Sequence, residues 1–295
     1  MSRPLSIVAV QTSPVAWDPP ATWTAFEADL RARRGSSPNA HLFVYPELHL
    51  SALGRLGIPV PPGYSMRRVA EPIPGPLTER LCALAKELGI WLVPGSFYEP
   101  GEGSAVYNTA IAIAPDGTIR AKYRKIFPWR PRETTTPGTE FVVFDIDGIG
   151  RAGLMICYDG WFPEVPRHLA WMGAEVIIQP TLTDTADRAQ EFVLGQANAI
   201  VNQVFIVNVN AGGALGMGNS LIVDPEGHVL TSASQGEAEL TTVMDLDAVV
   251  RAHDYGTAGL DRLWAQLAED TAGLKLPLYG GDFRALHGPK RTPDS

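Results

Sequence analysis

Apolar and polar residues along this chain of 295 residues follow two different periodicities. Short, mainly apolar runs predict buried strands at residues 5–10, 90–94, 151–156 and 204–209. Longer segments with apolar positions at helical spacing predict helices at about residues 21–34, 76–88, 163–172 and 186–203. Helices that alternate with buried strands indicate an α/β protein with a layered core.

Two parts of the chain resemble each other. Residues 40–46 and 174–180 are apolar runs that each follow a predicted helix and stop at a proline. Further along, residues 115–117 and 225–227 both combine proline, an acidic residue and glycine between two strand-like runs. Proline fixes φ and glycine tolerates a positive φ, so both triplets predict tight hairpin turns. The repeat predicts one domain built from two related halves.

The pattern ends before the chain does. We assign residues 1–250 to the layered domain and residues 251–295 to a C-terminal tail of that domain. Trp264, Leu274 and Tyr279 are apolar residues of this tail that a single domain would leave exposed. We therefore expect the tail to lie at an oligomer interface.

Charge and cysteine content exclude several classes of function. The 32 acidic residues outnumber the 24 basic ones, and the formal charge of -8 repels nucleic acid and anionic lipid. No apolar run approaches the roughly 20 residues of a membrane helix, and the start of the chain shows no cleavable signal. Two cysteines are too few for a disulfide framework and fit a reducing compartment. We expect a cytoplasmic protein with no nucleic-acid or membrane partner.

Three reactive side chains follow predicted strands. Glu47 comes after an apolar run, Lys125 leaves the first hairpin, and Cys157 follows the strand at residues 151–156. Reactive groups gather beyond the carboxyl ends of strands in open α/β sheets, so a carboxylate, an amine and a thiol would converge here. The alternatives are a small core residue for Cys157 and solvated charges for Glu47 and Lys125. Cys82 lies within a helical pattern, and we assign it to the core.

Other kinds of site have little support in the sequence. The six histidines lack the spacing of zinc ligands, and we expect no metal. Neither a G-x-S-x-G elbow nor a phosphate-binding loop of the G-x-x-x-x-G-K-[ST] type occurs. The glycine-rich segment 212–218 precedes a strand, which is the wrong context for a dinucleotide site. We interpret it as a loop near a pocket or as a packing turn.

Residues 45–47, 122–125 and 153–164 together resemble the motifs of the carbon-nitrogen hydrolase (nitrilase) superfamily, in its amidase-like branch. The motifs occur in the family order, and the resemblance covers the chain from the first strand to about Asp247. It implies a four-layer α-β-β-α sandwich built from two related halves. It also implies association into a homodimer or higher homo-oligomer, and chemistry that needs no cofactor.

The resemblance further implies a role for each residue of the site. Cys157 would be the nucleophile and Glu47 the base that takes its proton. Lys125 and the backbone N–H of Tyr158 would stabilise the oxyanion. Glu133 resembles a second glutamate that positions substrate or water, and its alternative is a surface acid in an exposed loop.

The reaction follows from what surrounds the cysteine. Tyr158 and Asp159 come next, as in the amide-cleaving branches, and residues 160–162 lack the arginine with which omega-amidases and many carbamoylases often bind a substrate carboxylate. We expect a small neutral amide, water as the second substrate, and Trp129 and Trp161 as pocket walls. The alternatives are a nitrilase, an N-carbamoyl hydrolase, an acyl transferase with the same thioester, and a non-catalytic interaction module.

Overall fold

The computed structural model describes residues 2–54, 59–270, 275–276 and 281–282. The elements of the first half are β1 (Pro4–Gln11), α1 (Pro19–Ser36), β2 (Leu42–Val44), α2 (Pro76–Leu88), β3 (Trp91–Val93), β4 (Ser96–Pro100), β5 (Val106–Ile113) and β6 (Ile119–Arg124). The second half contains β7 (Val142–Ile146), β8 (Gly150–Leu154), η1 (Cys157–Trp161), α3 (Glu164–Trp171), β9 (Val176–Thr181), α4 (Arg188–Asn202), β10 (Phe205–Asn210), β11 (Leu221–Val223) and β12 (Val229–Ser232). All four predicted helices and the predicted strands are present, with ends that differ by a few residues.

Each half forms its own sheet. The first sheet has the order β13-β1-β2-β3-β5-β4, where β13 spans Ala238–Asp245 and β6 pairs with β5. The second sheet has the order β12-β11-β10-β9-β8-β7. The strands β1, β2 and β3 are parallel, as are β8, β9 and β10, and each of these sets is followed by an antiparallel hairpin. Strand β13 (Ala238–Asp245) returns from the second half and pairs with β1 over eight residues. This crossing joins the two halves at the edge of the first sheet.

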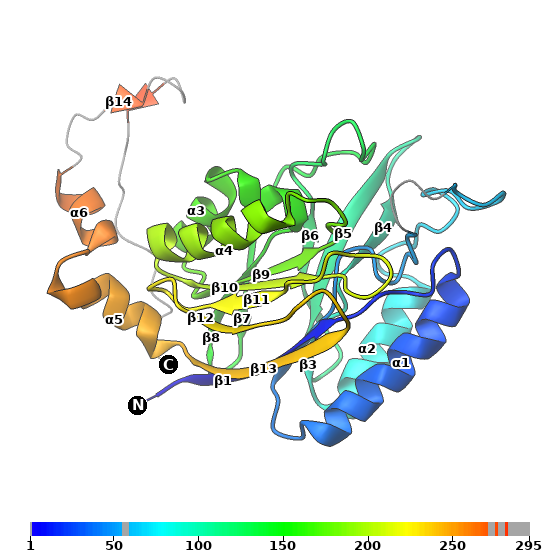
Figure 1. The fold of residues 1–295 in the computed structure, drawn as a ribbon, viewed down its shortest axis with the longest axis horizontal. Coiled ribbons are helices and arrows are strands. Elements are labelled where there is room, and N and C mark those ends of the chain that lie inside the picture. Colours follow the sequence, from blue (N-terminus) through cyan, green and yellow to red (C-terminus); the bar gives the residue numbers. More distant parts are fainter. Residues whose placement is uncertain (1, 55–58, 271–274, 277–280, 283–295) are drawn as a thin grey trace.

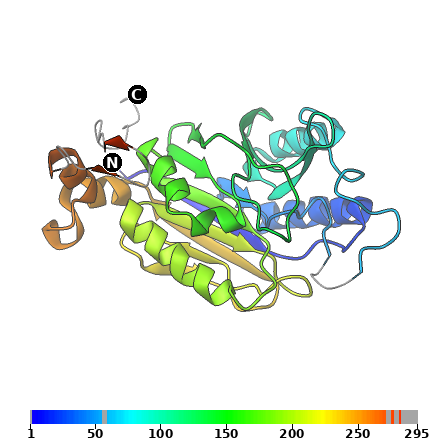
Figure 2. The same ribbon diagram turned by 90° about the horizontal axis from the view of Figure 1, so that it is seen from above.

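The two sheets face each other between two layers of helices (Figures 1 and 2). One apolar cluster lies between the sheets and includes Ile7 and Val44 from the first and Val176 and Val207 from the second. Helices α1 and α2 cover the outer face of the first sheet, and α3 and α4 cover that of the second. The predicted four-layer α-β-β-α sandwich of two related halves is confirmed.

The repeat extends to the packing of the hairpin turns. Gly117 and Gly227 have φ values of 84° and 87°, which a side chain would disfavour. A Cβ at Gly117 would lie 2.9 Å from the carbonyl oxygen of Cys82 in α2, and one at Gly227 would lie 2.5 Å from Ile200 in α4. In each half, glycine therefore lets the hairpin approach the second helix.

The C-terminal segment begins with helices that pack on the second half. Helix α5 (Asp247–Tyr255) is followed by η2 (Thr257–Gly259), α6 (Leu263–Asp270), β14 (Lys275–Leu276) and β15 (Gly281–Asp282). Trp264 is buried, donates from Nε1 to the carbonyl oxygen of Asn202 at 3.1 Å, and lies under the guanidinium group of Arg167. The expectation that Trp264 is exposed was wrong, because its indole covers the end of α4. Leu274 and Tyr279 lie outside the described residues.

Among the helices that the structure describes, none combines the length and the hydropathy that a membrane crossing requires.

Candidate active site

Glu47 lies just after β2, at the carboxyl end of the parallel strands of the first sheet. Its side chain is only 3% exposed. Oε1 accepts hydrogen bonds from Lys125 Nζ and Asn108 Nδ2, each at 2.8 Å, and Oε2 accepts one from the backbone N–H of Leu182 at 2.9 Å. Leu182 follows β9 of the second sheet, so Glu47 lies where the two halves meet.

The ammonium group of Lys125 lies between two carboxylates. Its Nζ donates to Oε1 of Glu47 at 2.8 Å and to Oε2 of Glu133 at 2.5 Å. Glu133 also accepts hydrogen bonds from the backbone N–H of Trp129 at 2.7 Å and from Asn108 Nδ2 at 3.1 Å. One ammonium group and one amide therefore bridge both carboxylates, which fixes Glu47 and Glu133 relative to each other.

Cys157 is the first residue of η1, the short 3-10 helix that follows β8. Its φ of 46° lies in the left-handed region, which is unfavourable for a residue with a side chain and persists only where neighbouring contacts enforce it. One such contact comes from Gln179, whose Nε2 donates to the Cys157 carbonyl oxygen at 2.8 Å. The buried thiol lies near Glu47, whose charge acts on it, and its sulfur lies 3.7 Å from Oγ1 of Thr183.

Burial determines the protonation of these groups. It raises the pKa of Glu47 to about 7, with Lys125 opposing this rise and Glu133 adding to it. It also raises the pKa of the Cys157 thiol well above its ordinary value, and the charge of Glu47 adds to that effect. Burial disfavours the charge on Lys125, but the carboxylates outweigh it and raise the Lys125 pKa. At neutral pH the site holds an uncharged thiol, a charged amine and a carboxyl group poised to exchange a proton.

Asp159 ties the cysteine turn to the segment that follows Lys125. Its carboxylate accepts hydrogen bonds from the Tyr123 hydroxyl at 2.7 Å and from the backbone N–H groups of Ile156 and Phe127 at 2.9 and 2.8 Å. Burial raises the pKa of Asp159 to about 6. Phe127 also stacks on Phe162, just beyond η1, with ring centroids 3.7 Å apart. These contacts fix the lysine segment against the cysteine turn.

The residues predicted to bind substrate lie on both sides of the thiol. Tyr158 occupies the first turn of η1, where backbone N–H groups have no acceptor within the helix. Trp161 ends the same helix, and its Nε1 donates to Glu191 Oε1 at 3.4 Å. Trp129 lies in the segment that positions Glu133, and its side chain is half-buried. Contact of Tyr158, Trp129 or Trp161 with a substrate stays a prediction.

Four polar residues of the site were not singled out by the sequence. Asn108 extends from β5, Thr183 follows β9, and Arg188 and Glu191 form a buried ion pair at the start of α4. Asn108 had a signal, since it is a polar residue in an apolar strand-like run. The ion pair had none, because charges spaced three apart on a helix are usually solvated.

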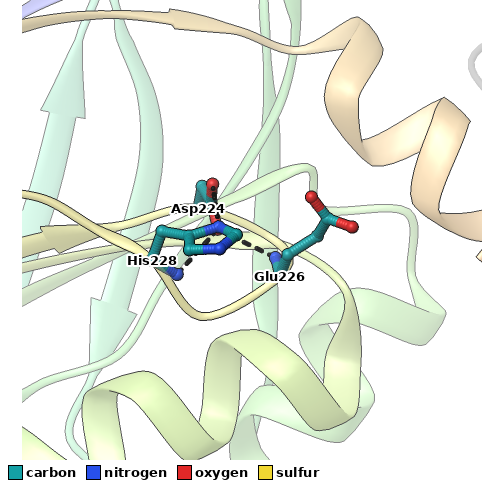
Figure 3. A group of neighbouring side chains, drawn as sticks. All are labelled: Asp224, Glu226 and His228. Atoms are coloured by element: carbon teal, nitrogen blue, oxygen red, sulfur yellow. Dashed lines mark hydrogen bonds and ion pairs between the residues drawn. The ribbon is translucent and has the colours of Figure 1, made fainter. Parts of the chain in front are cut away.

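Outside this site, two other features bear on the predicted chemistry. Ligand atoms of Asp224, Glu226 and His228 lie within 4.8 Å of one another (Figure 3). The Asp224 carboxylate accepts hydrogen bonds from the backbone N–H groups of Glu226 and His228, which is the arrangement of a tight turn. We base no metal site on this exposed turn. The other cysteine, Cys82, is partly buried against the core beneath α1 and α2.

Comparison with known proteins places the chain in a family. Residues 6–254 match the family model for carbon-nitrogen hydrolases. The chain belongs to the carbon-nitrogen hydrolase family. Members of this family are hydrolases of carbon-nitrogen bonds, so the predicted enzyme class is confirmed.

Individual relatives agree with this family. The human omega-amidase NIT2 is 32% identical over 230 residues, which are 72% of this chain and 80% of that protein. The crystal structure of Nit3 from Saccharomyces cerevisiae, a member of branch 10 of the nitrilase superfamily, has a TM-score of 0.75, is 25% identical, and covers 85% of this chain and 93% of its own. An amidase from Nesterenkonia sp. is 24% identical, with a TM-score of 0.71, and the match covers 84% of this chain and 93% of the amidase chain. At this identity the likeness supports the fold alone.

Proposed function

We propose that this carbon-nitrogen hydrolase is an amidase that converts a small neutral amide into a carboxylic acid and ammonia through a thioester on Cys157. The observation that carries the proposal is the buried Glu47–Lys125 pair beside an uncharged thiol. Membership of the family supports a carbon-nitrogen bond as the bond that breaks. The name of the human relative, an omega-amidase, supports an amide as the substrate.

The first step is attack of the Cys157 sulfur on the amide carbonyl carbon. Because burial holds the thiol in its protonated form, a base has to take the proton as the carbon-sulfur bond forms. Glu47 lies near enough for its charge to act on the thiol, and it has a pKa of about 7, so its carboxylate serves as that base. The electron pair of the carbonyl moves to oxygen and gives a tetrahedral oxyanion.

The oxyanion needs donors that are already in place. Lys125 stays charged and is fixed by two carboxylates, and the backbone N–H of Tyr158 adds a second donor one residue from the thiol. Each preorganised donor of this kind typically contributes about 100-fold to 1,000-fold in rate. Glu47 then passes its proton to the nitrogen, the carbon-nitrogen bond breaks, and ammonia leaves a thioester.

Hydrolysis of the thioester uses the same groups. Glu47 takes a proton from water as the water oxygen attacks the thioester carbon, and it returns that proton to the departing sulfur. Glu133 assists by fixing the position of Lys125 and by sharing the Asn108 amide with Glu47. The cycle consumes one amide and one water, and it needs no external oxidant or cofactor.

Charge favours a neutral substrate. The buried cations of the described site are both engaged, Lys125 by Glu47 and Glu133, and Arg188 by Glu191 and neighbouring carbonyl oxygens. A substrate carboxylate would enter among paired acids without a free guanidinium group to bind it, which costs free energy. We therefore place small uncharged amides ahead of the carboxylate-bearing amides that the omega-amidase relatives suggest.

The test is ammonia release from a matched panel: aliphatic amides, dicarboxylate half-amides, carbamoyl amino acids and nitriles. We expect the highest kcat/KM on an aliphatic amide, a mass increase on Cys157 that equals its acyl group, and loss of turnover in Cys157→Ala. Cys82→Ala is the matched control and keeps its activity. Best turnover of a half-amide would contradict the neutral substrate, and full activity of Cys157→Ala would contradict the mechanism.

We also propose a cytoplasmic homodimer. Val193, Ile200 and Val201 on α4 are 63%, 46% and 43% exposed, and a second subunit would bury this apolar face. Light scattering at micromolar concentration tests the association, and a monomer would contradict it.

A further inference from the structure

A chain of buried hydrogen bonds leads from the Cys157 sulfur into helix α4. The sulfur contacts Oγ1 of Thr183 at 3.7 Å, and that hydroxyl donates to Oε1 of Glu191 at 2.9 Å. Arg188 Nη1 donates to the other oxygen of Glu191 at 2.8 Å. The side chains of Arg188 and Glu191 are only 2% and 4% exposed. None of these contacts is used in the reaction derived above.

Arg188 is held in place by acceptors on several sides. Its Nε donates to the carbonyl oxygen of Gly218 at 2.9 Å, and its Nη2 donates to Oδ1 of Asn208 at 2.7 Å and to the carbonyl oxygen of Asn219 at 2.8 Å. Gly218 closes the glycine-rich segment 212–218, which thus contacts the Arg188–Glu191 ion pair. A guanidinium group fixed in this way presents a rigid donor to Glu191.

The direction of each hydrogen bond follows from what each group can donate. A carboxylate only accepts, so the single hydrogen of the Thr183 hydroxyl points at Glu191. The Thr183 oxygen then presents a lone pair to the Cys157 sulfur, and in that contact the thiol is the donor. The Thr183 oxygen is therefore the acceptor of the thiol hydrogen, and Glu47 lies near enough for its charge to act on the thiol.

We propose that Thr183, oriented by the Arg188–Glu191 ion pair, holds the Cys157 thiol in its protonated form until Glu47 takes the proton. Thr183 contacts the reacting sulfur, and Glu191 and Arg188 are positioning residues. The burial that raises the Cys157 pKa, to which the charge of Glu191 adds, agrees with this arrangement. A neutral thiol resists oxidation and alkylation, and the nucleophile is released when its proton reaches Glu47. The inference rests on the proposed role of Cys157 as nucleophile.

Glu191→Gln reverses the hydrogen bond to Thr183. Arg188 can only donate, so the oxygen of the new amide has to face Arg188 and its NH₂ group has to face Thr183, and the weaker hydrogen bond from Trp161 Nε1 to that position is lost. The NH₂ group then donates to the Thr183 oxygen, and the hydroxyl hydrogen turns toward the sulfur. A hydroxyl that donates to sulfur stabilises the thiolate, and the loss of the Glu191 charge acts in the same direction.

The measurement is the pH dependence of Cys157 alkylation by iodoacetamide, followed by mass spectrometry of the peptide. Cys82 in the same sample is the internal reference. We expect Glu191→Gln to move the midpoint down by about one pH unit, so that alkylation at pH 7 becomes about tenfold faster. Adding Thr183→Val should remove most of that shift, and adding Thr183→Ser, which keeps the hydroxyl, should retain it.

Two results would overturn the proposal. One is an unchanged midpoint in folded Glu191→Gln protein, as judged by circular dichroism. The other is an equal shift in the Thr183→Val background, since the charge of Glu191 would then act through space without the hydroxyl. Alkylation does not depend on turnover, so either result is distinct from a failure of the amidase proposal, which Cys157→Ala tests.

Discussion

The pH at which Glu47 becomes a base should depend on the charge of Glu133. Burial raises the Glu47 pKa to about 7, and Glu133 adds to that rise as a like charge. In the proposed mechanism only the carboxylate form of Glu47 can take the thiol proton, so kcat/KM should increase as the pH rises through about 7. Glu133→Gln removes the like charge and keeps the volume. The acidic limb of the profile should therefore move to lower pH.

The structure gives the size of this shift. Lys125 Nζ lies 2.8 Å from the Glu47 oxygen and 2.5 Å from the Glu133 oxygen that it bridges. The two oxygens are therefore no more than about 5 Å apart, and two unit charges at that separation repel by about 3 kcal/mol at an effective dielectric constant of about 20. This energy corresponds to about two pH units. Because the variant can relax and admit water, we expect a shift of about one to two pH units.

The assay is kcat/KM for ammonia release from the best amide over the range from about pH 5 to 9. Glu140→Gln is the matched control, because it removes the same charge from an exposed position of the segment that follows Glu133. We expect its acidic limb to coincide with that of the unmodified enzyme. An acidic limb of Glu133→Gln that stays at the original pH, or moves upward, would refute the electrostatic coupling between the two glutamates.

Three further changes test other parts of the structure. Asn108→Ala removes the amide that bridges Glu47 and Glu133. Because hydrogen bonds to charged groups contribute about 1.5–3 kcal/mol, we expect kcat to fall by about 10-fold to 100-fold with little change in KM. A change confined to KM would contradict this. Arg188→Met leaves the Glu191 carboxylate buried without its ion-pair partner. The free energy of unfolding, measured by urea titration, should fall by about 3–5 kcal/mol. An unchanged free energy of unfolding would show that the ion pair is dispensable. Gly227→Ala should lower the free energy of unfolding by more than Gly148→Ala does. Both glycines have a positive φ, but only Gly227 is crowded by α4. Equal losses of unfolding free energy in the two variants would contradict that packing.

The sequence predicts those parts of the fold that short segments encode. The apolar runs of β1, β3, β8 and β10 are buried on both faces, so their pattern is visible without a partner. Strand β13 was missed because it is an edge strand whose buried residues, such as Leu240 and Met244, alternate with exposed ones. Its place beside β1 depends on residues more than 200 positions away.

The same distinction applies to the site. Glu47, Lys125 and Cys157 each lie in a compact motif, so a resemblance to the family locates them. Asn108 and Thr183 gain their importance from contacts with these motifs across the fold, which local patterns do not encode. Trp264 was assigned to the surface for the same reason, because its burial depends on the packing of α6 on α4.

The charged groups of the site are paired within each half, whereas Glu47 and Cys157 come from different halves. Lys125 pairs with Glu47 and Glu133 in the first half, and Arg188 pairs with Glu191 in the second. Neither half therefore has to bury an uncompensated cation when the sheets come together, which limits the free-energy penalty of a charged interior. The hydrogen bonds that cross the junction include one from the backbone N–H of Leu182 to Glu47 and two from Tyr123 and Phe127 to Asp159. Because Glu47 belongs to the first half and Cys157 to the second, the proposed proton transfer from sulfur to carboxylate depends on the packing of one half against the other.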